Sequence, residues 1–296
     1  MKRLIILALT LTVGLSACDV LDLEPKDRVT QFDYFKTAND LELFSNPFYN
    51  NLLDKEPFDE QSDLLVQNTL SAILFGGSHR TVPESGGGWS WTDLRRMNTL
   101  LEYADMCEDK EAVTKYTAVT RFFRAFFYFE KVKRFGDVPW YEQVIGSEEE
   151  ELLKKPREDR GIIMDHVMND LKNAIEMLPR EKDVARVTRW SALALKSRIA
   201  LYEGTWRKYR NLPDADKYLQ LAADAASTFI SESGYSLYKE GTEPYRDLFC
   251  SDDAKQEEVI LARIYNFEGL NLSHNVQFNI RNSAAGFTRR FMNHYL

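Results

Sequence analysis

The sequence predicts an all-α fold of helical hairpins with long loops and little β-structure. Apolar residues recur three and four positions apart in successive segments, as they do on the buried face of a helix. Helix-capping residues precede several of these segments, and glycine or proline follows them. The chain has 296 residues, which is enough for one large domain or two small ones.

The first two predicted helices lie in the first third of the chain. Thr37 and Asn39 are good N-cap residues for the first. Its apolar residues are Leu41, Leu43, Phe44 and Phe48. The second begins at Trp91 and carries Leu94, Met97, Leu101 and Ala104 at helical spacing.

The strongest helical pattern covers residues 111–135. One apolar stripe consists of Val113, Tyr116, Val119, Phe123, Phe126 and Val132, and it is widened by Phe122, Phe127 and Phe129. We therefore expect this helix to be buried on most sides. Gly136 suits its C-terminal cap, and Pro139 prevents its continuation. For Arg121 and Arg124 we expect structural ion pairs or stacking on rings, with ligand contact as the alternative.

Three more helices and a weaker C-terminal pattern follow. Residues 162–178 form one helix, closed by Pro179. Thr188 caps the next, which we expect to end at Gly204, and residues 214–230 form the third. Beyond Ser233 the helical pattern fades. Residues 259–264 alternate enough to predict a strand, and residues 266–287 read as loop.

One helical pair resembles a tetratricopeptide-like repeat. Trp190, Leu193 and Ala194 provide a bulky, an apolar and a small residue in its first helix. Ala225 and Phe229 match the spacing of its second helix. Small residues let two helices approach, and large ones fill the space beside them. A generic helical hairpin would satisfy the same loose spacing.

The N-terminus has the pattern of a bacterial lipoprotein signal. Lys2 and Arg3 precede an apolar run at residues 4–13, which is too short to span a bilayer. The sequence Leu-Ser-Ala then precedes Cys18 and looks like a lipobox; an ordinary signal peptide with a nearby cysteine is the alternative. We expect a signal peptide at 1–17, a lipidated tether at 18–28 and a helical domain at 29–296. Acyl chains on Cys18 would hold the protein on a membrane without a spanning helix.

Net charge and cysteine content restrict the classes of ligand and binding partner. Removal of residues 1–17 takes away two positive charges and shifts the formal net charge from −8 to −10. Such a chain is a poor partner for nucleic acid or acidic polymers, so a neutral ligand or an uncharged membrane-protein partner is favoured. Cys107 and Cys250 give no disulfide framework or metal spacing, and we expect both to be small buried apolar residues.

A longer set of motifs resembles the SusD/RagB family of nutrient-binding outer-membrane lipoproteins. The most specific is the segment at 121–140, RFFRAFFYFEKVKRFGDVPW. The others, in the expected order, are Leu21–Pro25 after Cys18, the set Trp91, Leu94 and Asn98, the helix from Arg186 to Tyr202, and Gly234-Tyr235-Ser236-Leu237. Family members continue well past the end of this chain, which we therefore expect to be a fragment or a truncated product.

The resemblance implies a function. It implies a surface protein that binds an oligosaccharide nutrient and passes it to a SusC-like TonB-dependent transporter. Within this class, a peptide instead of a sugar is the alternative ligand. Two other classes stay open: a helical-repeat scaffold without its own ligand site, and a lipid-anchored glycoside hydrolase. Ligand binding by this chain alone is in doubt, because the absent part would supply some of the ligand face.

The sequence offers no catalytic constellation and predicts no cofactor or metal. Its four histidines are scattered: His79, His166, His274 and His294. It contains no Gly-x-Ser-x-Gly elbow and no phosphate-binding glycine loop. Carboxylates are plentiful, so spacing alone does not exclude a glycosidase pair. We expect residues 148–151 to be a solvated charge run and His166 to lie at the surface.

The best candidate ligand surface is the segment 75–91. It holds five of the chain's 14 glycines, which allow a loop to approach a ligand closely. An exposed ring can stack on a sugar, while arginine and histidine side chains bond its hydroxyl groups. Trp89, His79 and Arg80 are the predicted ligand-binding residues. The alternative is that Trp91 packs in the core and Trp89 covers it.

Overall fold

The computed structural model describes residues 34–53, 64–66, 86–265 and 286–294. The predicted signal peptide, Cys18, His79 and Arg80 lie outside these residues, so their predicted roles stay predictions. Within the described part the fold is predominantly helical, as the sequence predicts. No described helix is long and apolar enough to cross a membrane.

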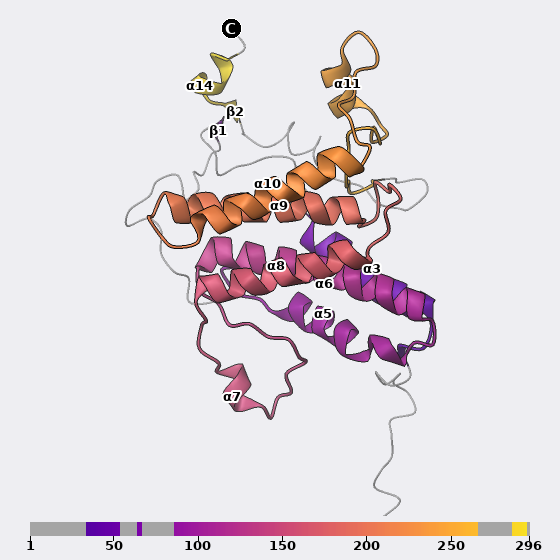
Figure 1. Ribbon diagram of the computed structural model, residues 1–296, viewed down its shortest axis with the longest axis vertical. Helices are drawn as coiled ribbons and strands as arrows, with labels where there is room; N and C mark the ends of the chain where they lie inside the picture. The colour runs from indigo at the N-terminus through magenta and orange to yellow at the C-terminus, as the bar shows by residue number, and fades with distance from the viewer. Residues whose placement is uncertain (1–33, 54–63, 67–85, 266–285, 295–296) are drawn as a thin grey trace, which may run out of the picture.

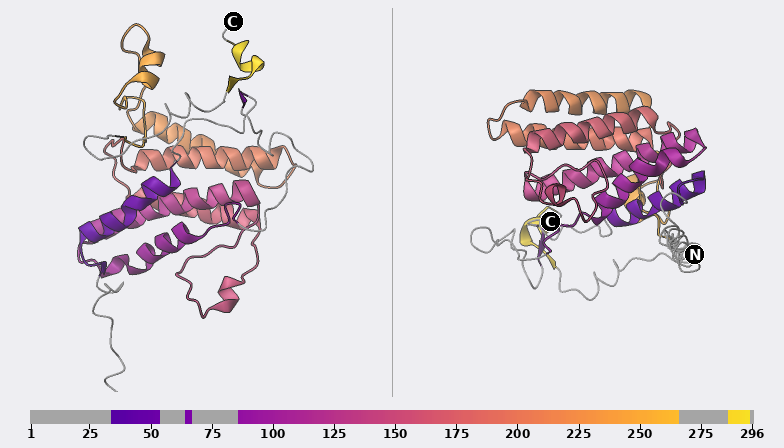
Figure 2. Two further views of the ribbon diagram at one scale, coloured as in Figure 1. Left: turned by 180° about the vertical axis from the view of Figure 1, so that it is seen from behind. Right: turned by 90° about the horizontal axis from the view of Figure 1, so that it is seen from below.

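The long helices stack in layers. The helix α6 (Lys110–Phe135) packs along α8 (Arg160–Met177), and α9 (Arg189–Lys208) packs along α10 (Ala215–Glu232). Contacts between α8 and α9 join these two pairs. On the side of α6 away from α10 lie α3 (Ala38–Leu52) and α5 (Thr92–Tyr103), so the layers succeed one another from α10 to α5 (Figures 1 and 2).

Short elements lie at the margins of these layers. They are η3 (Ala104–Met106), α7 (Glu150–Leu153), α11 (Pro244–Cys250) and α14 (Arg289–Met292). The strands β1 (Leu65–Val66) and β2 (Gly286–Phe287) pair antiparallel, with Leu65 opposite Phe287. The loop that contains α7 extends beside α5, whereas α11 projects from the opposite end of the molecule (Figure 1).

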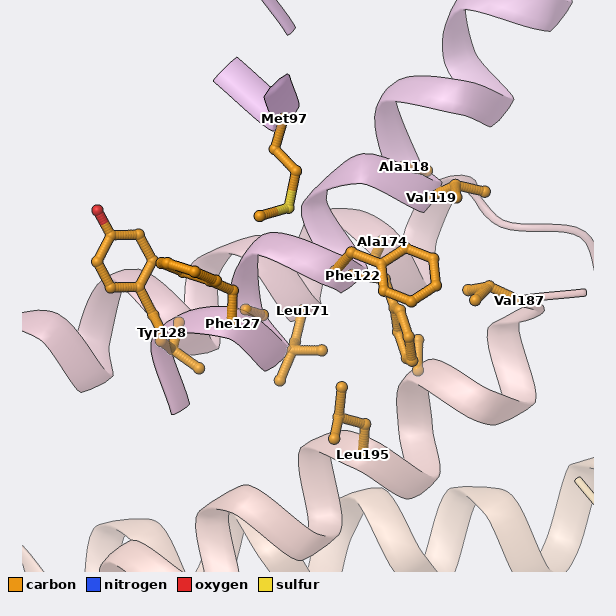
Figure 3. Close-up of a cluster of buried hydrophobic side chains, with 14 of the residues drawn as sticks. Met97, Ala118, Val119, Phe122, Phe127, Tyr128, Leu171, Ala174, Val187 and Leu195 are labelled. Carbon is orange, nitrogen blue, oxygen red and sulfur yellow. The ribbon is translucent and has the colours of Figure 1, made fainter. Parts of the chain in front are cut away.

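The helix α6 is the centre of the core, as its apolar pattern predicts. Phe122, Phe127 and Tyr128 are buried on it, and the close-up shows them with Leu171 of α8 and Leu195 of α9 (Figure 3). Met97 of α5 reaches the same cluster from the other side. A helix buried on several faces needs partners on each of them, which explains why α6 touches α3, α5, α8 and α9.

The helix boundaries follow local chemistry. Thr37 and Thr188 each form a capping box, with Asp40 and Ser191 respectively. Asp109 caps α6 by accepting hydrogen bonds from the backbone N–H groups of Glu111 and Ala112, each at 3.0 Å. Gly136 ends α6 with a positive φ of 74°, as predicted.

The tetratricopeptide-like pair is the hairpin of α9 and α10. Trp190 and Leu193 are buried on α9, and Ala225 is buried on α10. The rings of Trp190 and Phe229 meet edge to face, with centroids 6.4 Å apart. The predicted division of small and large residues is therefore the packing that joins the two helices.

Three predictions of secondary structure are wrong. Gly204 does not end its helix, because α9 runs on to Lys208. Residues 259–264 form no strand: the Ala262 N–H donates to the carbonyl of Val184 at 2.7 Å, without a ladder of further bonds. Gly286 and Phe287, expected in a loop, form β2.

The two cysteines of the described residues differ in burial. Cys107 is buried, as expected, whereas Cys250 at the end of α11 is exposed because that short helix projects from the bundle. Both are free thiols.

Candidate functional site

A cavity of about 610 Å³ lies between the N-terminal half of α5 and the loop that carries α7. One wall comes from Trp89, Trp91 and the first turns of α5. The other comes from residues 153–157 and from Pro139, Tyr141, Gln143 and Ile145. Its volume falls within the range of small-molecule sites, roughly 300–1,000 Å³. Trp89 and Trp91 of the predicted surface and a loop some fifty residues later thus come together.

Aromatic rings form the apolar part of this cavity. Trp89 meets Trp91 edge to face at 5.1 Å and Phe135 at 4.8 Å, yet it remains 38% exposed. Trp91 is half-buried and also contacts Tyr141 at 5.8 Å, with the rings at 86°. Trp91 thus packs against the core, whereas Trp89 both covers it and lines the cavity.

A glycine turn places Trp89. Gly86, Gly87 and Gly88 all have positive φ, at 72°, 61° and 83°. The Trp89 N–H closes the turn on the Gly86 carbonyl at 3.1 Å. From α6, Lys131 donates to the Gly88 carbonyl at 2.5 Å.

Lys131 also holds the turn against the core. Its Nζ lies 4.8 Å from the ring centroid of Phe127 and 5.7 Å from that of Trp91. Burial lowers the pKa of this lysine. The tryptophan wall is therefore fixed to α6.

A chain of buried polar groups fixes the opposite wall. Asn98, which is 1% exposed, donates to the carbonyls of Tyr141 and Gln143 at 3.0 and 3.1 Å. The side-chain amide oxygen of Asn98 accepts a hydrogen bond from Arg124 at 3.3 Å. Arg124 in turn donates two hydrogen bonds to the carboxylate of Asp170 in α8, at 2.7 and 2.8 Å. This confirms the prediction of a structural ion pair for Arg124.

Tyrosine and glutamate anchors complete that wall. The Tyr141 N–H donates to the Tyr128 hydroxyl at 2.8 Å, and the Tyr141 hydroxyl donates to the carbonyl of Leu152 at 3.1 Å. Burial raises the pKa of Tyr141. Partial burial opposes ionisation of Glu158, but bonds from Lys155 and the Trp140 N–H outweigh it and lower the pKa of Glu158.

Cationic side chains also line the cavity. Arg95 projects from α5 and donates to the carbonyl of Ile145, and Arg157 lies over the Trp89 ring at 4.9 Å. Lys154 and Lys155 follow α7. The cavity therefore combines apolar rings, backbone carbonyls and cationic groups, a mixture suited to a polar ligand with an apolar face.

Comparisons with known proteins give a consistent result. A family model described as starch-binding and associating with the outer membrane, SusD-like 3, matches residues 90–201. A SusD-like protein, P25, from Formosa agariphila is 22% identical over 82% of this chain and 47% of its own length. A SusD-like protein from Bacteroides ovatus is 28% identical over 51% of this chain and 26% of its own.

The architecture agrees with these sequences. A SusD homologue of known structure from Bacteroides thetaiotaomicron has a TM-score of 0.62 at 20% identity, covering 80% of this chain and 48% of the other. Residues 90–201 thus resemble a SusD-like family, and the fold of the described residues resembles that of the SusD homologue. The chain spans about half or less of the length of these curated relatives.

Sequence reasoning singled out one residue of the cavity. Trp89 lines the cavity, and its predicted role in ligand binding stays a prediction. Tyr141, Arg95 and Arg157 were missed, because only the fold brings their loop against α5. Asn98 was noted solely through the family resemblance, and its bonds to the loop supply the structural reason.

The other predicted surface features are confirmed. His166 is 37% exposed, stacks on Trp140 with ring centroids 4.5 Å apart, and lies 3.8 Å from Glu142. Residues 148–151 form an exposed charge run.

Proposed function

We propose that this SusD-like chain binds an oligosaccharide in the cavity beside α5. The observation that carries the proposal is a partly exposed tryptophan, fixed by the glycine turn, at the edge of a cavity with polar groups on the facing wall. A sugar ring has apolar C–H faces and a rim of hydroxyl groups. Trp89 would stack on the face, while Arg95, Gln143 and Arg157 would bond the rim.

The comparisons support a carbohydrate over other small ligands. The matched family model is described as starch-binding and associating with the outer membrane, and its 90–201 range includes both walls of the cavity except Trp89. The predicted ligand residues His79 and Arg80 would add hydrogen-bonding groups from the segment before Trp89. Peptide is the alternative ligand within the same class.

The proposed setting is the cell surface. Cys18 would carry the lipid anchor, with residues 18–28 as the tether and residues 29–296 as the binding domain. Bound ligand would then pass to a SusC-like TonB-dependent transporter. Binding, not turnover, is the proposed activity; among the described residues that line the cavity there is no Asp or Glu to act as a glycosidase acid or base.

Calorimetry with neutral and charged oligosaccharides and short peptides tests the proposal. The protein is the chain processed by its own leader and recovered from membranes in detergent. We expect saturable binding of at least one oligosaccharide, weakened about tenfold or more by Trp89→Ala, equivalent to about 1.4 kcal/mol. Trp89→Phe should keep part of the affinity, because a smaller ring can still stack.

The control is Tyr209→Ala. Tyr209 is 84% exposed at the end of α9, so its removal should leave both folding and binding unchanged. Thermal unfolding monitored by circular dichroism separates loss of the site from loss of the fold. A folded protein that binds no oligosaccharide but copurifies with a transporter would contradict the proposal and favour a scaffold. Release of new reducing ends would favour a hydrolase.

A further inference from the structure

The charge of the cavity is opposite to that of the chain. The chain has a formal net charge of −8, yet four side chains that line the cavity are cationic. They are Arg95, Lys154, Lys155 and Arg157, and the described lining contains no carboxylate. In a confined site the local arrangement of charges, and not the sum over the chain, sets the potential that a ligand meets.

These four cations are not equally available. Lys155 is paired with Glu158 at 2.5 Å, and Lys154 with Glu150 at 2.6 Å. The second pair is about three-quarters exposed at both side chains, where ion pairs are weak and easily exchanged. Arg95 and Arg157 have no carboxylate partner in the described part of the chain.

Their positions place these two arginines at the cavity. Arg157 lies over the ring of Trp89, with its Cζ 4.9 Å from the centroid. This stacking leaves the edge of the guanidinium, which carries its N–H donors, available for an anion. Arg95 is held by the Ile145 carbonyl, a neutral acceptor that does not cancel its charge. Both walls of the cavity thus contribute a guanidinium.

We infer that the cavity selects an acidic sugar, whose carboxylate or sulfate binds the guanidinium groups of Arg157 and Arg95 while its ring lies against Trp89. This inference rests on the proposed oligosaccharide-binding function and narrows it to anionic glycans. Arginine matches both anions geometrically, because two of its N–H groups can bond two oxygens of one group. The net charge of the chain favours a neutral ligand, whereas the cationic lining of the cavity favours an anionic one.

The test compares ligands that differ in charge alone. Oligogalacturonate and its fully methyl-esterified form have the same length and ring geometry, and a sulfated oligosaccharide provides the second anion. We expect the acid form to bind about tenfold or more tightly than the ester, in keeping with a charge-assisted hydrogen bond. This preference should shrink as the salt concentration rises. Binding of the sulfated sugar instead would keep the inference and identify sulfate as the anion.

Matched variants locate the effect. Arg157→Gln and Arg95→Gln should each reduce the affinity for the acidic sugar by about tenfold. The affinity for the ester should fall by clearly less, because glutamine can still bond a hydroxyl group but carries no charge. Arg210→Gln is the control: Arg210 is an exposed arginine that lies 4.4 Å from the ring centroid of Trp206, outside the cavity. It should change neither affinity.

The outcomes separate this inference from the proposed function. Equal binding of the acid and the ester would overturn the inference and leave oligosaccharide binding intact. Failure of every oligosaccharide to bind a folded chain would overturn both. Binding of a single-stranded oligonucleotide as tightly as the acidic sugar would overturn the inference in favour of general polyanion binding.

Discussion

Asp170 shows how one buried residue can organise a distant surface. It is 1% exposed and accepts hydrogen bonds from Arg124 and, at 3.0 Å, from Arg121. Burial opposes the charge of Arg124, but the bonds and charge of Asp170 outweigh it and raise the pKa of Arg124. Through Arg124 and Asn98, Asp170 is connected to the backbone of the cavity loop. A carboxylate in α8 therefore supports a wall that it does not touch.

Asp170→Asn should be strongly destabilising. The amide cannot neutralise the two arginines, so Arg124 would be left as a buried charge without its counterion. We expect the free energy of unfolding to fall by about 3–5 kcal/mol, measured by urea denaturation. Glu243→Gln, which breaks an exposed pair with Arg246, should cost less than about 1 kcal/mol. Equal effects of the two substitutions would show that the buried network adds little.

At the scale of single residues, the sequence predicts the contact partners of a residue when they lie in the same helix. The ion pair or ring contact of Arg124 was predictable, because an arginine among buried aromatic residues needs a partner. Its partner Asp170 was not, because 46 residues separate them. The same reason explains why Trp89 was found and Arg157, which stacks on it from a later loop, was missed.

At the scale of elements, the α9–α10 hairpin depends on a close approach at Gly204. A Cβ atom added there would lie 2.8 Å from Leu219 Cγ and 2.9 Å from the Leu219 backbone nitrogen. Real Cβ contacts are essentially never that short, and a backbone atom cannot move aside without its helix. The glycine that sequence reasoning took for a helix end is thus a helix-packing residue.

Gly204→Ala should destabilise the chain, although alanine favours an isolated helix by about 1 kcal/mol over glycine. Overpacking against α10 costs more, and we expect a net loss of about 1–3 kcal/mol in thermal or urea unfolding. Adding Leu219→Ala should recover part of the loss, because it removes the clash with the side chain but not that with the backbone. A more stable Gly204→Ala variant would contradict the close packing.

Helices were predictable as elements and strands were not. Capping residues and apolar spacing are local, so α9 begins after the predicted cap Thr188, and α6 begins within one residue of its predicted start at 111. Strands need a partner from elsewhere in the chain. Residues 259–264 alternate but find no partner strand, whereas Gly286 and Phe287 pair with β1 over two hundred residues away.

At the scale of the whole molecule, buried tyrosines lie in two separate layers, those of α6 and α10. Tyr116 and Tyr128 lie on α6, and Tyr218 lies on α10. Burial, a hydrogen bond to Glu42 and the charge of Glu42 raise the pKa of Tyr116 from 10.0 to about 12. Burial also raises the pKa values of Tyr128 and Tyr218, and a hydrogen bond to Asp165 adds to the second. The layers thus share a sensitivity to alkaline pH.

The chain should therefore lose stability as pH rises above about 10. A raised pKa in the folded state means that the unfolded chain releases its proton first, so the contribution is complete below pH 10 and is lost between 10 and about 12 for Tyr116. One pKa unit corresponds to about 1.4 kcal/mol, and solvent around the half-exposed Glu42 screens part of the interaction, so Tyr116 contributes on the order of 1–2 kcal/mol. Urea unfolding at a series of pH values, with tyrosinate absorbance recorded in parallel, measures this loss.

Tyr116→Phe should lower stability at neutral pH, because the hydrogen bond to Glu42 is lost, but it should flatten the alkaline decline in stability. Tyr209→Phe, at an exposed position, should leave the profile unchanged, and an unaltered slope in Tyr116→Phe would show that this tyrosine does not govern the transition.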